Sequence, residues 1–178
     1  MNSRQREDME HRQEAEQLLA NPQGPDDQAR AYVILGVISE HEQDWDAAVQ
    51  NYSRALSAVP DHPHTRYYSN NNLAYSLIQL GRFDDAEDYC LAAIEIDGER
   101  HNAHKNLGLA YQGQGRWLDA ALSFLAAYEL NPRDPRAWHH LEKVLAARPV
   151  LLKQSETLRS GVKAMQKAIA GGGCTVMQ

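Results

Sequence analysis

The sequence predicts an all-α fold: a right-handed α-solenoid of three helix hairpins, with one helix before them and a capping helix pair after them. Two observations predict this fold. A short motif recurs at Leu35-Gly36, Leu73-Ala74 and Leu107-Gly108, and each copy holds two runs with helical periodicity on either side of a turn. Repeats of roughly 20 to 50 residues are typical of solenoids, in which each unit stacks on the next.

Each copy of the motif is followed by the same kinds of residue in the same order: an aromatic residue, an alanine, a larger residue and a second alanine. Alanine and glycine let two helices approach closely, and the aromatic side chains fill the space around them. One such hairpin cannot bury its apolar face alone, so neighbouring hairpins must stack. The repeated residues are Trp45, Ala48, Tyr52 and Ala55; Phe83, Ala86, Cys90 and Ala93; and Trp117, Ala120, Phe124 and Ala127.

The spacing between copies predicts one longer helix. The second and third copies are 34 residues apart, whereas the first and second are 38 apart. Four extra residues add about one helical turn, so they lengthen a helix without rotating its faces. Pro63 is predicted to begin this helix, one turn longer than its equivalents, because proline is favoured at the first helical position. Gly81 and Gly115 suit the tight turns between paired helices.

Two segments carry a recognisable family pattern. Its residues are Tyr32, Leu35, Gly36, Trp45, Ala48, Tyr52, Ala55 and Pro60 in the first, and Leu107, Gly108, Tyr111, Gly115, Trp117, Ala120, Phe124, Ala127 and Pro132 in the second. These segments resemble the tetratricopeptide repeat family. The match covers residues 29–145, including a half-copy that begins at Trp138 and Leu141. The resemblance implies a helical repeat that binds other proteins, and it says little about which partner.

The helical patterns divide the chain into four parts. Residues 4–20 are predicted as a polar leading helix, which the run from Asn21 to Pro25 breaks. Apolar residues at helical spacing from Leu151 to Ile169 predict an amphipathic helix that caps the last repeat. The predicted parts are an N-terminal helix and linker (1–26), three repeats within 27–134 (about 29–62, 63–100 and 101–134), a partial fourth repeat with the capping helix (135–170) and a disordered tail (171–178).

The net charge and the lengths of the apolar runs limit the class of protein. The formal net charge of −6 argues against nucleic acid as a main partner, because nucleic-acid-binding proteins usually present a basic stripe. No apolar run reaches the length of about 18 residues expected of a membrane span, and the charged N-terminus does not read as a secretory signal. We therefore expect a reduced, cytoplasmic protein.

Cysteine and histidine residues do not predict chemistry. Cys90 lies on the buried stripe of a helix and is expected in the core, and Cys174 is one place too early for a prenylation box because Gln178 follows Met177. His101 and His104 face together on a helix, but no cysteine or carboxylate completes a metal-ligand pattern. Since nucleophile elbows and phosphate-binding loops are also missing, we expect no enzyme, no metal and no cofactor.

The resemblance implies that the first helix of each hairpin lines a concave face, and the packed stripe identifies the residues that point toward it. Four amides lie near the middle of that face, at Asn71, Asn72, Asn102 and Asn106. An amide carries a donor and an acceptor, so it can pair with both polar groups of a peptide unit. The predicted partner-binding residues are Tyr68, Asn71, Asn72, Tyr75, Asn102, Lys105, Asn106, Leu109, Gln112, Arg136, His139, His140 and Lys143.

Each group in this set has a plainer alternative. The asparagines are either groove ligands or solvated polar residues, although Asn72 and Asn106 hold the places where peptide-binding members of the family carry an asparagine ladder. Tyr68 and Tyr75 are either binding anchors or packing residues. The basic residues toward the end of the face either grip an acidic side chain or a terminal carboxylate, or form a solvated face.

Some members of the family clamp the acidic C-terminus of heat-shock chaperones with lysines, an arginine and asparagines. Only Asn72 matches one of those residues here, and the other places hold Val33, Val37, Asn102 and Asn106. The sequence therefore argues against a clamp of that kind.

Two classes of function follow. In the first, the chain is a non-catalytic adaptor or chaperone-like module whose groove captures an extended peptide segment of another protein, acidic where it meets the basic residues. In the second, it is a structural scaffold that self-associates through its ends or its convex side, and the feature that favours it is the apolar residues of the end helices, at Leu18-Leu19 and at 151–169. A secretion-type chaperone is a narrower version of the first. We expect a protein partner, no nucleic acid and no membrane span, with the oligomeric state left open.

Overall fold

The computed structural model describes residues 3–171, with side chains up to residue 168. Within that range it holds ten helices and no strand, which confirms the predicted all-α helical-repeat solenoid, and none of these helices has both the length and the hydropathy of a membrane span. The predicted tail at 171–178 lies outside the described residues except for Gly171, and so does Cys174. The helices are α1 (Ser3–Ala20), α2 (Pro25–His41), α3 (Trp45–Ser57), α4 (Pro63–Gln79), α5 (Phe83–Ile96), α6 (His101–Gly113), α7 (Trp117–Leu130), α8 (Pro135–Ala147), α9 (Leu151–Gln154) and α10 (Glu156–Gly171).

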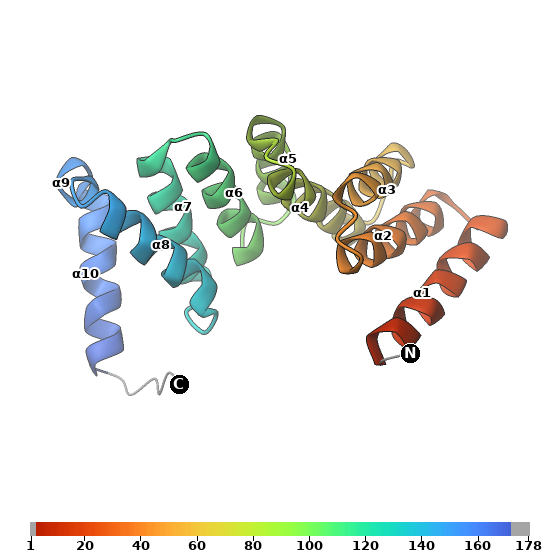
Figure 1. The fold of residues 1–178 in the computed structure, drawn as a ribbon, viewed down its shortest axis with the longest axis horizontal. Coiled ribbons are helices and arrows are strands. Elements are labelled where there is room, and N and C mark those ends of the chain that lie inside the picture. Colours follow the sequence, from red (N-terminus) through yellow and green to blue (C-terminus); the bar gives the residue numbers. More distant parts are fainter. Residues whose placement is uncertain (1–2, 172–178) are drawn as a thin grey trace.

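The helices pack in chain order along an arch, with α1 and α10 at its two lower ends (Figure 1). Between residues 25 and 130 they form three hairpins, α2 with α3, α4 with α5 and α6 with α7. The first helices of successive hairpins also touch, α2 with α4 and α4 with α6. Residues that project from the shared face of these first helices are therefore brought together.

The predicted start of α4 is correct. The prediction that α4 is one turn longer than its equivalents holds against α6 and is wrong against α2. The helix begins at Pro63 and has 17 residues, against 13 in α6. The first helix of the first hairpin, α2, also has 17 residues. The helix α2 begins earlier than the motif indicates, because Pro25 lies in the first turn of α2, where proline is favoured.

Close approach within each hairpin depends on one pair of residues. A Cβ added to Gly36 would lie 2.5 Å from the ring of Tyr52, and one added to Gly108 would lie 2.6 Å from the ring of Phe124. In the middle hairpin the equivalent place holds Ala74, and the facing place holds the smaller Cys90. The larger residue on one helix is thus accommodated by a smaller residue on the other.

The thiol of Cys90 is fully buried, which confirms the predicted core position. Burial raises the pKa of this thiol to about 12, with a further contribution from the Glu87 carboxylate. Because the thiolate is the reactive form of cysteine, Cys90 behaves as a packing residue rather than a nucleophile.

The closing helix α10 covers the apolar side of the last hairpin. Leu158, Val162 and Met165 are buried in one cluster with residues of α7 and α8. Gly161 lies between them, and a Cβ there would come within 2.4 Å of Leu125 in α7. Although glycine weakens a helix, it permits this contact between α10 and α7.

The turns inside the three hairpins share one hydrogen-bond pattern. The first helix of each hairpin is followed, two residues after its end, by a residue of positive φ, which is 60° at Gln43, 74° at Gly81 and 77° at Gly115. The next backbone N–H then donates to a carbonyl five residues earlier, at 2.9 Å for Asp44 to Ser39. This is the Schellman arrangement, in which glycine is usual at the position with positive φ. Gln43 therefore occupies a place that favours glycine.

A buried carboxylate lies inside the first hairpin. The Tyr52 hydroxyl donates to Oε1 of Glu40 at 2.8 Å, between α3 and α2. Burial raises the pKa of the Glu40 carboxyl, and the hydrogen bond from Tyr52 opposes part of that rise. Burial also raises the pKa of Tyr52, and the charge of Glu40 adds to the rise.

Replacing Gln43 by glycine is expected to stabilise the protein by about 0.5–1 kcal/mol, because glycine adopts a positive φ without steric cost. Urea unfolding measures the change. Gly115→Ala, at the equivalent turn, is the opposite substitution and is expected to destabilise by a similar amount or more. A Gln43→Gly variant that is less stable than the parent would contradict the positive φ at this turn.

Replacing Glu40 by glutamine is expected to raise the free energy of unfolding above that of the parent, and the difference is expected to grow as the pH rises. The folded state raises the pKa of Glu40, so its stabilising contribution is complete below the ordinary glutamate pKa and is lost as the pH rises through the folded value. Glutamine keeps an acceptor for Tyr52 and removes the charge. Urea unfolding at pH 4.5 and pH 7.5 should show the advantage of Glu40→Gln growing with pH, whereas Glu95→Gln, at an exposed glutamate of α5, should show no such trend.

Candidate functional site

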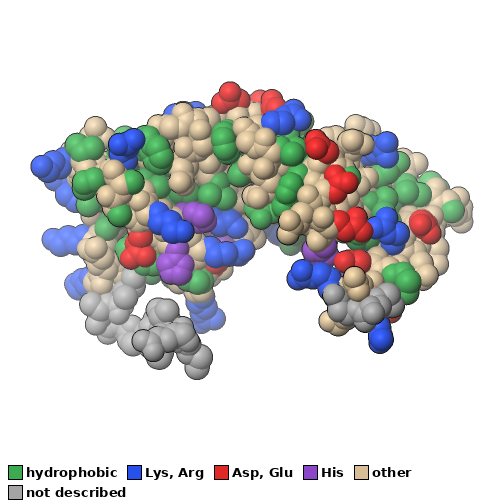
Figure 2. All heavy atoms as spheres, in the orientation of Figure 1, with side chains coloured by type: hydrophobic (Ala, Val, Ile, Leu, Met, Phe, Trp, Pro, Cys, Tyr) green, Lys and Arg blue, Asp and Glu red, His purple; other side chains and the backbone are tan. Residues whose placement is uncertain are grey.

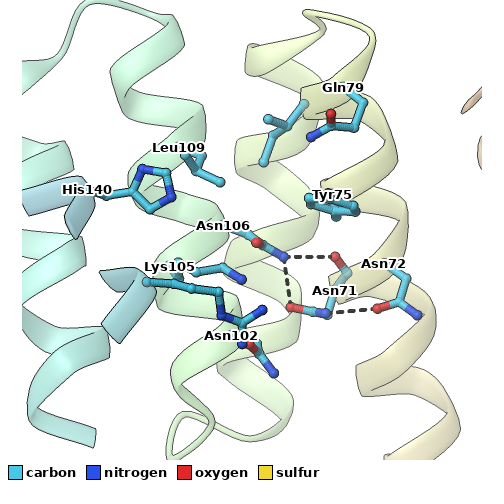
Figure 3. A pocket seen from close by; sticks show the side chains of 11 residues that line it. Asn71, Asn72, Tyr75, Gln79, Asn102, Lys105, Asn106, Leu109 and His140 are labelled. Atoms are coloured by element: carbon cyan, nitrogen blue, oxygen red, sulfur yellow. Dashed lines mark hydrogen bonds between the residues drawn. The ribbon is translucent and has the colours of Figure 1, made fainter. Parts of the chain in front are cut away.

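The inner side of the arch holds a cleft of about 550 Å³ between the first helices α4, α6 and α8, and we call it the central cleft. Figure 3 shows Asn71, Asn72 and Tyr75 on α4 across from Asn102 and Asn106 on α6. The lining residues are Asn71, Asn72, Tyr75, Ile78, Gln79, Asn102, Lys105, Asn106, Leu109, Arg136 and His140.

Most of the residues predicted to bind a partner therefore lie around one space, although their role in binding stays a prediction. Gln79 also lines the cleft and was missed by sequence reasoning. It follows Tyr75 by four residues, so the helical i,i+4 step was the signal that could have found it. The predicted residues that do not line the central cleft are Tyr68, Gln112, His139 and Lys143.

A chain of polar contacts runs across the three hairpins behind the cleft. Nδ2 of Asn106 donates to Oδ1 of Asn71 at 3.1 Å and to the Asn71 carbonyl oxygen at 3.3 Å. Nδ2 of Asn71 in turn donates to Oδ1 of Asn72 at 2.9 Å. Nδ2 of Asn72 lies 3.5 Å from the Tyr52 hydroxyl, which donates to Glu40. We call these five residues the amide chain.

The amide chain corrects one expectation about the asparagines. Asn71 and Asn106 were predicted either to bind a partner or to be solvated, but their exposed fractions are 8% and 2%, and their NH₂ groups donate inside the protein. The reason is the close contact of α4 with α6, which brings the two side chains within reach of each other. Within the described residues, Oδ1 of Asn106 has no hydrogen-bond partner.

Lys105 brings a positive charge to the α6 side of the cleft. Its exposed fraction is 9%, and no ion pair or hydrogen bond of the described residues includes its amine. Burial lowers the pKa of this amine, the Arg136 guanidinium lowers it further, and the Asp134 carboxylate opposes them. The amine itself is not fully buried, so this positive charge is open to the cleft and favours an anion there.

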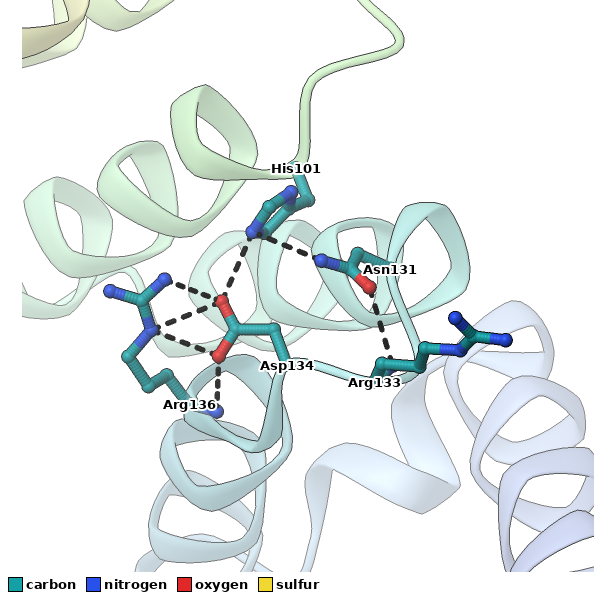
Figure 4. Close-up of polar contacts among 5 residues, drawn as sticks. All are labelled: His101, Asn131, Arg133, Asp134 and Arg136. Carbon is teal, nitrogen blue, oxygen red and sulfur yellow. Dashed lines mark hydrogen bonds and ion pairs between the residues drawn. The ribbon is translucent and has the colours of Figure 1, made fainter.

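The Asp134 carboxylate, whose charge acts on Lys105, already binds two other residues (Figure 4). It accepts three hydrogen bonds from the Arg136 guanidinium at 2.7–3.0 Å and one from the Arg136 backbone N–H at 3.0 Å. Nε2 of His101 lies 3.0 Å from Oδ2 of the same carboxylate. The contacts from Arg136, followed by His101, hold the pKa of Asp134 well below its usual range. Asp134 therefore neutralises Arg136 and leaves Lys105 unpaired.

His140 forms the α8 side of the cleft. Its ring stacks on Phe124, with centroids 5.1 Å apart and planes 17° apart. Burial lowers the pKa of His140, and the positive charges of Lys143 and Lys105 lower it further. The ring therefore favours its neutral form, and Lys105 is the main source of unbalanced charge in the cleft.

A second hollow lies further toward the N-terminus, between α1, α2 and α4. Two adjoining pockets of about 280 and 250 Å³ share Arg30, Val33 and Ile34. One pocket is also lined by Val37, His11 and Glu14, and the other by Tyr68, His64 and Thr65. We call the two together the apolar pocket. Arg30 pairs with Glu14 of α1 across it, so α1 packs beside the concave side.

The two tyrosines named as candidate anchors behave differently. Tyr75 packs edge-on against Trp45 of the preceding hairpin, with ring centroids 5.8 Å apart. Tyr68 is 36% exposed and stacks obliquely on His64 at 4.4 Å. Tyr68 is therefore available to a partner at the apolar pocket, whereas Tyr75 also joins two repeats.

The surface changes along the arch (Figure 2). Lys, Arg and His side chains gather on the inner side of the half that holds α7 to α10. Several Asp and Glu side chains lie over the other half. The concave side thus runs from an apolar pocket near α2, past the amides of α4 and α6, to a positive end near α8.

Comparison with known proteins identifies the repeat. Two family models, both described as tetratricopeptide repeat, match residues 41–108 in one case and residues 12–63 and 105–141 in the other. The small glutamine-rich tetratricopeptide repeat-containing protein 2 of Mycosarcoma maydis is 31% identical over 115 residues, which are 65% of this chain and 30% of that protein. The tetratricopeptide repeat protein 7B of Homo sapiens is 34% identical over 102 residues, which are 57% of this chain and 12% of that protein. The chain thus spans less than a third of the length of either relative.

Solved structures share the fold. The Arabidopsis OM64 TPR domain superposes with a TM-score of 0.63 at 23% identity, over 68% of this chain and 97% of that one. The second TPR domain of human RPAP3, in complex with an HSP70 peptide, gives 0.62 at 25% identity, over 68% and 98%. MamA from Desulfovibrio magneticus RS-1 gives 0.64 at 15% identity, over 93% and 97%. The chain belongs to the tetratricopeptide repeat family.

Proposed function

We propose that the chain binds an extended peptide segment of a partner protein in the central cleft, as an adaptor or chaperone-like module that carries out no chemistry of its own. Tetratricopeptide repeats are protein-interaction modules and are generally non-enzymatic. The second TPR domain of human RPAP3, which is 25% identical to this chain, holds an HSP70 peptide. That likeness supports a protein partner for this chain.

The observation that carries the proposal is the central cleft and its mixed lining. Its volume of about 550 Å³ falls within the range of about 300–1,000 Å³ that is typical of ligand sites. Asn102 and Gln79 line it, and among the described residues neither side chain has a hydrogen-bond partner. Leu109 and Ile78 add apolar surface. A peptide backbone needs both donors and acceptors, and these two amides can supply them.

The amide chain supports the same proposal in another way. Because Asn71, Asn72 and Asn106 hold one another, the wall between α4 and α6 is ordered before a ligand arrives. A preorganised wall lowers the entropic cost of binding, although the peptide itself must still become ordered. We expect modest affinity for a single short segment.

A self-associating scaffold is less well supported. That alternative needs free apolar surface on the end helices. Leu151, Leu158, Val162 and Met165 are instead buried against α7 and α8, with exposed fractions of 5% or less. The apolar stripe of α10 is therefore used within the chain, and Leu18 and Leu19 of α1 are also partly buried, so peptide capture is the function that the geometry favours.

The test is a selection of binders from a phage-displayed library of random 12-residue peptides, followed by calorimetry with the enriched sequences. The double variant Asn102→Ala, Gln79→Ala is expected to weaken binding about tenfold or more, since it removes hydrogen bonds of about 1 kcal/mol each. Its melting temperature should be close to that of the parent, because neither side chain has an internal partner among the described residues.

The matched control is Gln50→Ala with Gln166→Ala, which removes two exposed amides on α3 and α10, outside the cleft. This control should bind like the parent. Selected peptides that bind the cleft variant as tightly as the parent would place the binding site elsewhere and overturn the proposal.

A further inference from the structure

Lys105 is a charged group without a counter-ion in a site that is open to a ligand. More than nine-tenths of the residue is buried, it lines the central cleft, and its amine is unpaired within residues 3–171. Figure 3 shows it beside Asn102 and Asn106 at the edge of the open space. A buried lysine usually has a partner, so the partner of Lys105 is expected to come from another molecule.

The surrounding charges determine the sign of that partner. Asp134 is engaged by Arg136 and His101, and no hydrogen bond or ion pair of the described residues joins it to Lys105, although its charge still acts on that amine. His140 favours its neutral form, because burial and the nearby lysines lower its pKa. Because the charges of Asp134 and Arg136 cancel, the residues that line the cleft keep one positive charge, that of Lys105. A carboxylate complements this charge.

The other end of the concave side, near α2, favours an apolar side chain. The apolar pocket offers Val33, Ile34, Val37 and the exposed ring of Tyr68. Arg30, which lines both pockets, is already paired with Glu14, and the remaining polar lining is His11, His64 and Thr65. An apolar side chain can be buried there without leaving a charge unpaired.

Building on the function proposed above, we propose that the bound segment carries a carboxylate that pairs with Lys105 and an apolar side chain that enters the apolar pocket. Neighbouring helices pack about 8–10 Å apart, so the two steps from α2, which supplies Val33 and Ile34, through α4 to α6, which supplies Lys105, span about 16–20 Å. An extended chain advances about 3.3 Å per residue, which separates the two groups by about five or six residues. The site therefore reads two side chains at a set spacing, with polar contacts to the segment between them.

The probe is a set of amidated and acetylated Gly/Ser peptides that hold one leucine and one glutamate, in both orders and at separations from two to nine residues. Matched peptides replace glutamate by glutamine, or leucine by alanine. A further set lacks glutamate and ends in a free carboxylate, which separates a side-chain source from a terminal one. Fluorescence anisotropy measures the dissociation constants.

The parent protein is expected to bind best at a separation of about five or six residues and to lose about tenfold when glutamate becomes glutamine, as for a charge-assisted hydrogen bond. Lys105→Met should abolish that discrimination, so that glutamate and glutamine peptides bind this variant with equal affinity. Methionine keeps the length of the side chain and removes the buried charge, so this variant should melt no lower than the parent. Lys163→Met, at an exposed lysine of α10, is the control and should discriminate like the parent.

Equal affinity for glutamate and glutamine peptides, discrimination that survives Lys105→Met, or affinity independent of spacing would each overturn this inference. If the glutamine peptides still bind and lose affinity with the Asn102→Ala, Gln79→Ala variant, the proposed function stands while the charge pairing falls. If no peptide of the set binds, this inference is overturned, and the library-selected peptides decide the proposed function separately.

Discussion

The whole molecule depends on how closely the two helices of each hairpin approach. Gly36 lies against the ring of Tyr52, and Gly108 lies against the ring of Phe124. That contact fixes which face of the first helix is buried, and so it also fixes which face is left for the inner side of the arch. The central cleft is the space that remains between such faces on α4, α6 and α8.

Tyr52 connects this packing to the cleft. Its ring fills the space over Gly36 in the core of the first hairpin. Its hydroxyl donates to Glu40 and lies 3.5 Å from the amide of Asn72, where the amide chain begins its path toward α6. One side chain therefore takes part both in the apolar core and in the polar wall of the candidate site. Buried polar groups that are mutually satisfied tend to hold a single geometry, which suits a binding surface.

The fold was predictable because its signals are local and repeat. Size-restricted positions such as Ala48, Ala86 and Ala120 recur at fixed places, and each reports the close contact of two helices. The family resemblance implied that the first helices line the concave face, and the periodicity then indicated which of their residues point toward it. The length of α2 was not predictable in this way, because Pro25 begins the helix before the motif does.

The chemistry of the cleft was less predictable, because it depends on lateral distances between helices that periodicity does not give. Asn71 and Asn106 are 35 residues apart, and only the contact of α4 with α6 makes them partners. Lys105 was grouped with other basic residues, but its isolation follows from the pairing of Asp134 with Arg136.

The pairing of Ala74 with Cys90 limits how this chain can evolve. Each of the three facing pairs is separated by 16 residues, so the middle hairpin has the same register as its neighbours with both sizes changed. A lineage that moves from one pairing to the other by single substitutions must shrink one side before it enlarges the opposite one. The intermediate with glycine and cysteine contains a void, whereas the intermediate with alanine and an aromatic ring contains a clash. The order of the two substitutions is therefore constrained, and the accessible order passes through the intermediate that contains the void.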